Sequence, residues 1–137
     1  MTPQATIHVR SADAGDAVSV IEVRSDASFE GPPLHHHDFD EAFYVLDGEL
    51  TFRLGDDVFT RRAGESAFAP RGSRHTLANL SGAPARYLLI CTPGGFEARF
   101  EGGLSEAAER KPYLVTHMVG PTIREYLSSS DAPSSAG

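Results

Sequence analysis

The chain has 137 residues, which is enough to bury one substantial core but hardly two, so a single domain is expected. Hydrophobic residues make up 40% of the chain and charged residues 23%, as in folded globular proteins rather than disordered or fibrous ones. The formal net charge is −7 and no run of Lys and Arg exceeds two residues, so nucleic acid is not expected as a partner.

Targeting signals are not visible in the sequence. No stretch approaches about 18 consecutive apolar residues, and residues 1–10 do not combine a basic segment with an apolar run, so neither secretion nor membrane insertion is expected. Cys91 is the only cysteine, which excludes an intrachain disulfide and favours the cytoplasm as the location. Because Cys91 ends the apolar run 87–91, we expect a buried, unreactive thiol.

Short β-like runs, separated by Gly, Pro, Asn and Asp, dominate the chain up to residue 104. The predicted strands cover residues 6–10, 18–23, 34–37, 41–46, 49–54, 58–61, 66–69, 75–80 and 85–92. Asp47-Gly48 has the composition of a type I′ hairpin turn and Gly55-Asp56 marks a second tight reversal, which predicts a three-stranded meander. The pattern is that of an all-β barrel or sandwich.

The C-terminal part differs in composition. Residues 104–111 are compatible with a short helix outside the barrel, with Ser105 as N-cap and Pro112 ending it. Residues 128–137 are mostly Ser, Ala, Pro and Gly, which predicts a loose tail after a single domain of residues 1–127. No internal repeat is visible, so one barrel is expected rather than two.

A histidine-rich segment carries the first candidate site residues. In a strand, alternation sends His35 and His37 to the same face and His36 to the other, where it is expected to lie outside the site. Glu41 follows four residues after His37, at the start of the next predicted strand. Two imidazoles and a carboxylate are therefore expected to lie close together.

A second segment, residues 64–74, is a Gly- and Pro-containing turn that places His75 at the start of a strand. Taken singly, these residues have ordinary explanations as surface charges or hydrogen-bonded core histidines. Taken together, His35, His37, Glu41 and His75 predict a site for one divalent metal ion. Three imidazoles and one carboxylate suit Fe, Mn, Ni, Cu, Co or Zn better than Ca or Mg, and spacing alone does not choose among them.

These motifs resemble those of the cupin superfamily over residues 31–92. The residues that match the two cupin motifs are His35, His37, Glu41 and Gly48 in the first, and Gly64, Pro70, Gly72, His75 and Asn79 in the second. One departure is that the leading glycine of the first motif, Gly31, stands only four residues before His35. The resemblance implies a double-stranded β-helix (jelly-roll) barrel of two packed antiparallel sheets, commonly assembled as a homodimer. Residues 40–46 and 92–96 look most like the small quercetin 2,3-dioxygenase-like cupins.

Four phenylalanines are candidates for a substrate pocket. If Glu41 faces the metal, alternation places Phe43 on the inner face, and pairing across the Asp47-Gly48 turn would put Phe52 beside it. Phe59 and Phe68 could extend this surface, while Arg53 is expected to look outward or towards the rim. Ordinary core packing explains the same aromatic residues equally well.

Three functions stay open at this point. The first is a metal-dependent dioxygenase acting on a small enediol or flavonol-like molecule, with Glu41 as both metal ligand and catalytic base. The second is a non-oxidative isomerase, cyclase or decarboxylase that uses the metal as a Lewis acid. The third is a binding module that holds a small molecule without converting it, since one barrel fold serves all three.

Overall fold

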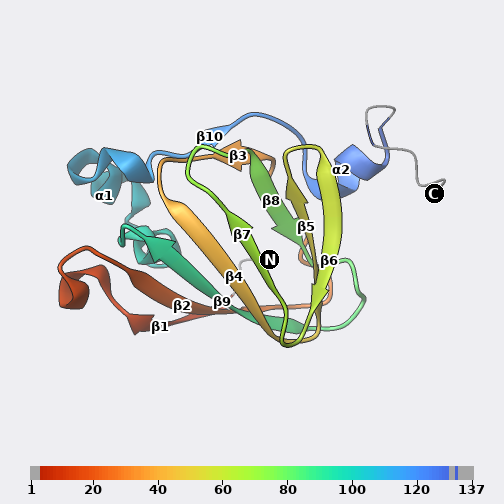
Figure 1. Cartoon of the computed structure of the whole chain (residues 1–137), viewed down its shortest axis with the longest axis horizontal. Helices are drawn as coiled ribbons and strands as arrows, with labels where there is room; N and C mark the ends of the chain where they lie inside the picture. The colour runs from red at the N-terminus through yellow and green to blue at the C-terminus, as the bar shows by residue number, and fades with distance from the viewer. Residues whose placement is uncertain (1–3, 130–131, 133–137) are drawn as a thin grey trace.

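The computed structural model describes residues 4–129 and 132, and in this part of the chain two five-stranded antiparallel sheets pack face to face (Figure 1). The first sheet has the order β1-β2-β9-β4-β7 and the second β10-β3-β8-β5-β6. The strands are β1 (Gln4–Val9), β2 (Ser19–Ser25), β3 (His35–His36), β4 (Asp40–Asp47), β5 (Glu49–Leu54), β6 (Asp57–Arg62), β7 (Ser66–Ala69), β8 (His75–Ala78), β9 (Ala85–Thr92) and β10 (His117–Met118). The all-β, double-stranded β-helix architecture is thereby confirmed.

Alternation along the strands builds the core between the sheets. Alternate residues of β9 are buried from Ala85 onward, and β2 follows the same period along most of its length. Phe43 from the first sheet meets Phe52 from the second, with ring centroids 5.2 Å apart. The two sheets are thus held together by apolar side chains that interdigitate across a shared interior.

The turn at Asp47-Gly48 does not make the predicted hairpin. β4 pairs with β7 and β9, whereas β5 pairs with β6 and β8, so this turn carries the chain from one sheet to the other. The predicted three-stranded meander is therefore wrong, because Asp-Gly indicates a positive φ but does not decide whether the flanking strands pair. The prediction at Gly55-Asp56 is confirmed, since Leu54 pairs directly with Asp57.

Short helices cover the ends of the barrel. They are α1 (Leu104–Arg110), α2 (Ile123–Leu127) and the 3-10 turns η1 (Ser11–Ala14), η2 (Phe96–Phe100) and η3 (Pro112–Leu114). The predicted helix is present as α1, but its N-cap is Gly103 without a side-chain bond, so the assignment of Ser105 as cap is wrong. None of the helices within the described ranges has the length and apolar character needed to cross a bilayer.

Two C-terminal elements, β10 and α2, were not predicted. α2 has a capping box in which Thr122 and Glu125 bond to each other's backbone N–H groups, a signal that is legible in the sequence but precedes a helix of only five residues. Its Tyr126 ring lies 3.5 Å from the Arg53 guanidinium, and Arg53 is therefore buried rather than outward-facing as expected. The loose tail predicted for residues 128–137 lies largely outside the described residues.

Gly31, the displaced motif glycine, is required by a close backbone approach. It has φ +78°, and a Cβ at this position would overlap the carbonyl oxygen of Leu77 on β8. Gly55 also has a positive φ, +60°, but a Cβ there would meet nothing within 4 Å. A substitution at Gly55 therefore costs only the unfavourable backbone conformation, whereas a substitution at Gly31 adds the cost of steric overlap.

We predict that Gly31→Ala lowers the free energy of unfolding by at least about 3 kcal/mol, because left-handed strain and overpacking add. Gly55→Ala, the matched control, should cost about 1–2 kcal/mol from the left-handed backbone alone. Urea unfolding followed by circular dichroism measures both. Equal losses in the two variants would contradict the close packing of residue 31 against β8.

Candidate functional site

The four residues predicted as metal ligands come together between the two sheets. His35 begins β3, His37 directly follows it, His75 begins β8, and Glu41 lies on β4 in the opposite sheet. One ligand atom from each residue lies within 4.8 Å of those of the other three, and all four residues are buried. His35 and His75 are direct neighbours in the register of β3 and β8.

Each imidazole is oriented by a backbone carbonyl two residues away. The Nδ1 atoms bond to Pro33 O at 2.8 Å for His35, to Phe39 O at 3.1 Å for His37, and to Ser73 O at 3.0 Å for His75. Since a carbonyl only accepts, each Nδ1 carries the hydrogen and each Nε2 is the atom left for a ligand. This arrangement is the one that fixes the tautomer of metal-binding histidines.

Further contacts hold His37 in place. The Phe39 ring stacks on its imidazole at a centroid distance of 3.6 Å with 3° between the planes. The backbone N–H of Gly72, in the turn of the second motif, donates to the carbonyl of His37 at 2.7 Å. The turn before His75 is thereby tied to the histidine segment, which explains why two distant motifs meet at one point.

Glu41 is ionised at the centre of this cluster. Burial opposes ionisation, but hydrogen bonds from the imidazoles of His37 and His75 outweigh it and lower the pKa of Glu41 to about 2. Oε1 of Glu41 is in close contact with Nε2 of His37 and lies 3.2 Å from Nε2 of His75. Burial, helped by the charge of His75, lowers the pKa of His35 to about 4 and keeps this imidazole neutral.

The donor set fits a divalent transition metal. Three Nε2 atoms and a carboxylate oxygen converge in a buried space, and three nitrogens with one oxygen suit the borderline metals from Mn to Zn. Oε1 of Glu41 and the Nε2 atoms of His37 and His75 face one another across the region where a cation would be bound. His35, His37, Glu41 and His75 would hold the ion.

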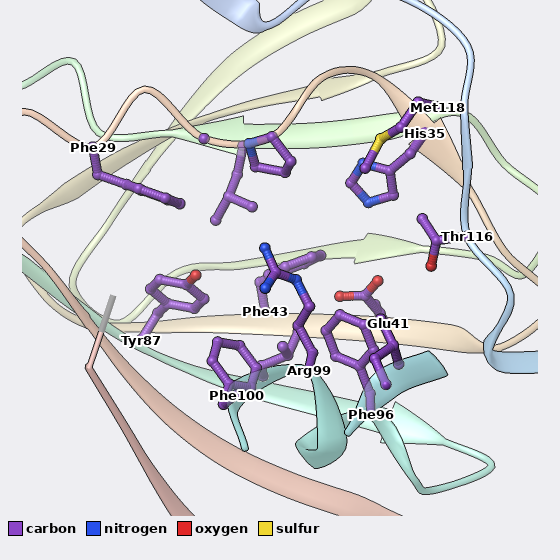
Figure 2. Close-up of a pocket in the computed structure, with 15 residues that line it drawn as sticks. Phe29, His35, Glu41, Phe43, Tyr87, Phe96, Arg99, Phe100, Thr116 and Met118 are labelled. Carbon is purple, nitrogen blue, oxygen red and sulfur yellow. The ribbon is translucent and has the colours of Figure 1, made fainter. Parts of the chain in front are cut away.

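A cavity of about 410 Å³ opens next to the cluster, between the sheets (Figure 2). It reaches His35 and Glu41 and is otherwise walled mostly by aromatic and aliphatic side chains. The lining residues are Phe29, Gly31, Pro32, His35, Glu41, Phe43, Leu77, Tyr87, Leu89, Phe96, Arg99, Phe100, Leu104, Thr116 and Met118. This volume is in the range of small-molecule sites.

Of the four phenylalanines predicted to line a pocket, only Phe43 lies at this cavity. Phe52 is a core residue from the opposite sheet, and Phe59 stacks against it at 5.9 Å. Phe68 is 54% exposed, because alternation along β7 turns Ala69 inward and Phe68 outward. The expectation that Phe52, Phe59 and Phe68 form this surface is therefore corrected.

The sequence-based prediction missed most of the cavity wall. Phe96, Arg99 and Phe100 come from η2, and Leu104 from α1, all of them after the last barrel strand. Phe29 comes from the segment before the first motif. Since none of these residues lies in a motif or an alternating strand, only the folded chain shows that they face the metal cluster.

His36 and Cys91 lie outside the cluster, as predicted. The His36 ring points to the other side of β3 and stacks on His117 of β10, with centroids 4.9 Å apart. Cys91 is fully buried, and burial raises the pKa of its thiol well above the usual value. A thiolate nucleophile at residue 91 has no support.

Two packed antiparallel sheets with this ligand cluster between them define a cupin-type protein, and comparison of the sequence agrees. The family model described as "Cupin domain" matches residues 23–91, half of the chain. The chain belongs to the cupin domain family.

Among curated proteins, the tetracenomycin polyketide synthase protein TcmJ of Streptomyces glaucescens is 32% identical over 60 residues. The match covers 43% of this chain and 40% of TcmJ, so the chain matches less than half of that relative's length. Among solved structures, TT1209 from Thermus thermophilus has a TM-score of 0.59 at 25% identity, covering 67% of this chain and 84% of that one.

A second solved structure, a predicted oxalate decarboxylase from Thermotoga maritima, has a TM-score of 0.62 at 17% identity. The match covers 66% of this chain and 80% of that chain. The polyketide cyclase RemF from Streptomyces resistomycificus has a TM-score of 0.58 at 23% identity, covering 66% of this chain and 64% of that one. These two likenesses show the shared fold.

We predict that untagged protein from minimal medium contains about one equivalent of a divalent transition metal. Glu41→Ala and His75→Ala should lower the metal content at least tenfold, because each removes one donor and leaves a buried group unpaired. His36→Ala is the matched control and should keep its metal, since its ring points away from the cluster. Elemental analysis of the purified variants measures this, and a metal-free wild type that cannot be reconstituted would contradict the site.

Proposed function

We propose that the protein is a metal-dependent enzyme that acts on a small aromatic molecule bound through an enol or phenol oxygen. The observation that carries this proposal is the position of Glu41 and His35, which belong to the three-histidine, one-glutamate cluster and also line the aromatic cavity. A molecule in the cavity therefore reaches the ligand cluster directly. A structural metal would instead be closed off on all sides.

The bound metal would supply Lewis acidity and, for a redox-active ion, a place for dioxygen to react. Glu41 has the role of base in this proposal. Its Oε1 faces His37 and His75, while Oε2 has no hydrogen bond within the described ranges. Because the carboxylate is ionised at neutral pH, Oε2 is available to accept the proton of a substrate hydroxyl.

The aromatic walls orient the substrate and exclude water. Phe96 lies 6.3 Å from His37 and 5.2 Å from Phe39, centroid to centroid, and so extends the packing around the cluster up to the cavity. Phe43, two residues after Glu41 on β4, lines the cavity from the same face of that strand. Planar rings of a substrate would stack against such surfaces, and the low polarity strengthens charge interactions at the oxygen being deprotonated.

Dioxygenation is the first reaction class that we assign to this site. It is supported by an imidazole and carboxylate set that suits redox-active metals, and by a cavity large enough for a planar enediol or flavonol-like molecule. Non-oxidative cyclisation is the second. The observation that favours it is the 32% identity to the polyketide synthase protein TcmJ over 60 residues.

The two reaction classes differ in their need for oxygen. We predict that metal-loaded protein converts a flavonol such as quercetin, or a related phenolic enediol, with consumption of O₂ and incorporation of both of its oxygen atoms into the products. Mass spectrometry of parallel aerobic and anaerobic reactions measures this. Conversion without O₂ to an isomeric or dehydrated product would instead support cyclisation.

Glu41→Gln should lower turnover by about 100-fold or more, since it removes the proton acceptor while keeping the shape of the side chain. His36→Ala is again the matched control and should turn over normally. Tight binding of the same compounds with no product under either atmosphere would contradict both enzymatic proposals and favour a binding module.

A further inference from the structure

Besides Thr116, whose hydroxyl donates to the carbonyl of Leu114, the cavity contains two polar side chains that have no role in the proposed metal site. Arg99, on η2, is the only Lys or Arg among the lining residues, and Figure 2 shows its side chain directed into the cavity. Tyr87, on β9, lies at the same cavity and is 3% exposed. Neither group belongs to the cupin motifs or to the ligand cluster.

Both groups lack a partner in the part of the chain that the structure describes. Across residues 4–129 and 132, the Arg99 guanidinium makes no ion pair or hydrogen bond. The carboxylate of Glu101, two residues later, is paired instead with Arg10 at 2.7 Å. The Tyr87 hydroxyl likewise has no hydrogen-bond partner in this range. A hydroxyl that lines a cavity without a protein partner is expected to bond to whatever occupies that cavity.

The segment that carries Arg99 is firmly anchored. The carboxylate of Glu97, two residues earlier, accepts hydrogen bonds from the Ser11 backbone N–H at 2.7 Å and from the Ser11 hydroxyl at 2.9 Å. The N–H of Gly95, which precedes η2, donates to the Ser19 hydroxyl at 2.8 Å. Arg99 itself is solvent-exposed, so it stands at the cavity mouth on a backbone that is already fixed.

Tyr87 lies far enough from Glu41 along the sheet for a fused-ring molecule to span the distance. On paired strands β4 and β9, Glu41 faces Cys91 and Val45 faces Tyr87. Tyr87 is thus displaced from Glu41 by four residues along the strand, which is about 13 Å. Apolar residues such as Phe43, Leu77 and Phe100 fill the walls between them.

We propose that the substrate is an aromatic carboxylate, with its enol or phenol oxygen at the metal cluster and its carboxylate bound by Arg99 and Tyr87. A guanidinium binds a carboxylate through two parallel N–H donors, and the Tyr87 hydroxyl adds a third. The apolar rings lie between these ends. This inference rests on the proposed function, because it specifies the substrate class of the same cavity.

The test is calorimetric binding of 6-hydroxy-2-naphthoate and of its uncharged methyl ester, to chelator-treated and to metal-loaded protein. Wild type should bind the acid about tenfold more tightly than the ester, since a charged hydrogen-bonded pair at a partly solvated mouth contributes roughly this much. Arg99→Gln should lose about tenfold in affinity for the acid and leave the ester unchanged. Tyr87→Phe should lower the affinity for the acid by about threefold to tenfold.

Arg110→Gln is the matched control, because Arg110 is an exposed arginine on α1 that does not line the cavity. Its affinity for both compounds should equal that of wild type. Failure to bind either compound, equal affinity of wild type for acid and ester, or an equal loss in Arg99→Gln and Arg110→Gln would overturn the proposal. A preference for the acid in protein that holds no metal and shows no turnover would contradict the proposed enzyme but not the anion-binding role of Arg99.

Discussion

Three hydrogen bonds from imidazole Nδ1 atoms to backbone carbonyls are the constraint on which the rest of this site depends. They turn the Nε2 atoms of His35, His37 and His75 towards Glu41, and they involve only carbonyls two residues away from each histidine. Because each bond is local, the orientation of a ring is settled as soon as its own strand end is formed. What remains for the fold is to bring three strand ends and one carboxylate to the same place.

The barrel does this by placing the ligands on both of its sheets. His35 and His75 are neighbours in one sheet, and Glu41 comes from the other, so the cluster joins the two layers across the core. Glycines make the approach close enough: a Cβ at Gly31 would overlap β8, and a Cβ at Gly48 would lie 2.7 Å from the carbonyl oxygen of Pro84. These two glycines of the first motif therefore serve the packing that positions the ligands.

The site combines a polar centre with a largely apolar cavity, and this contrast defines the proposed chemistry. Burial makes charged forms costly, so the ionised Glu41 is tolerated only because His37 and His75 bond to it. Elsewhere in the cavity, Arg99 and Tyr87 offer a cation and a hydroxyl that have no partner among the described residues, which is why we propose an anionic end group on the substrate.

The sequence alone determined the strands other than β10, the reversal at Gly55-Asp56 and the four residues of the cluster, because strand alternation and turn composition are local properties. It did not determine that Asp47-Gly48 joins two sheets, since a glycine turn permits a positive φ without selecting the partner of either strand. Because side chains alternate along β7, Phe68 points outward, but the predicted strand alone did not show which of its two faces is buried.

Only the tertiary structure decided the cavity. Arg53 is buried because α2, some 70 residues later, covers it, and the walls around Phe96, Arg99 and Phe100 are formed by segments that follow the barrel. These contacts depend on where separate segments pack rather than on the pattern within any one of them.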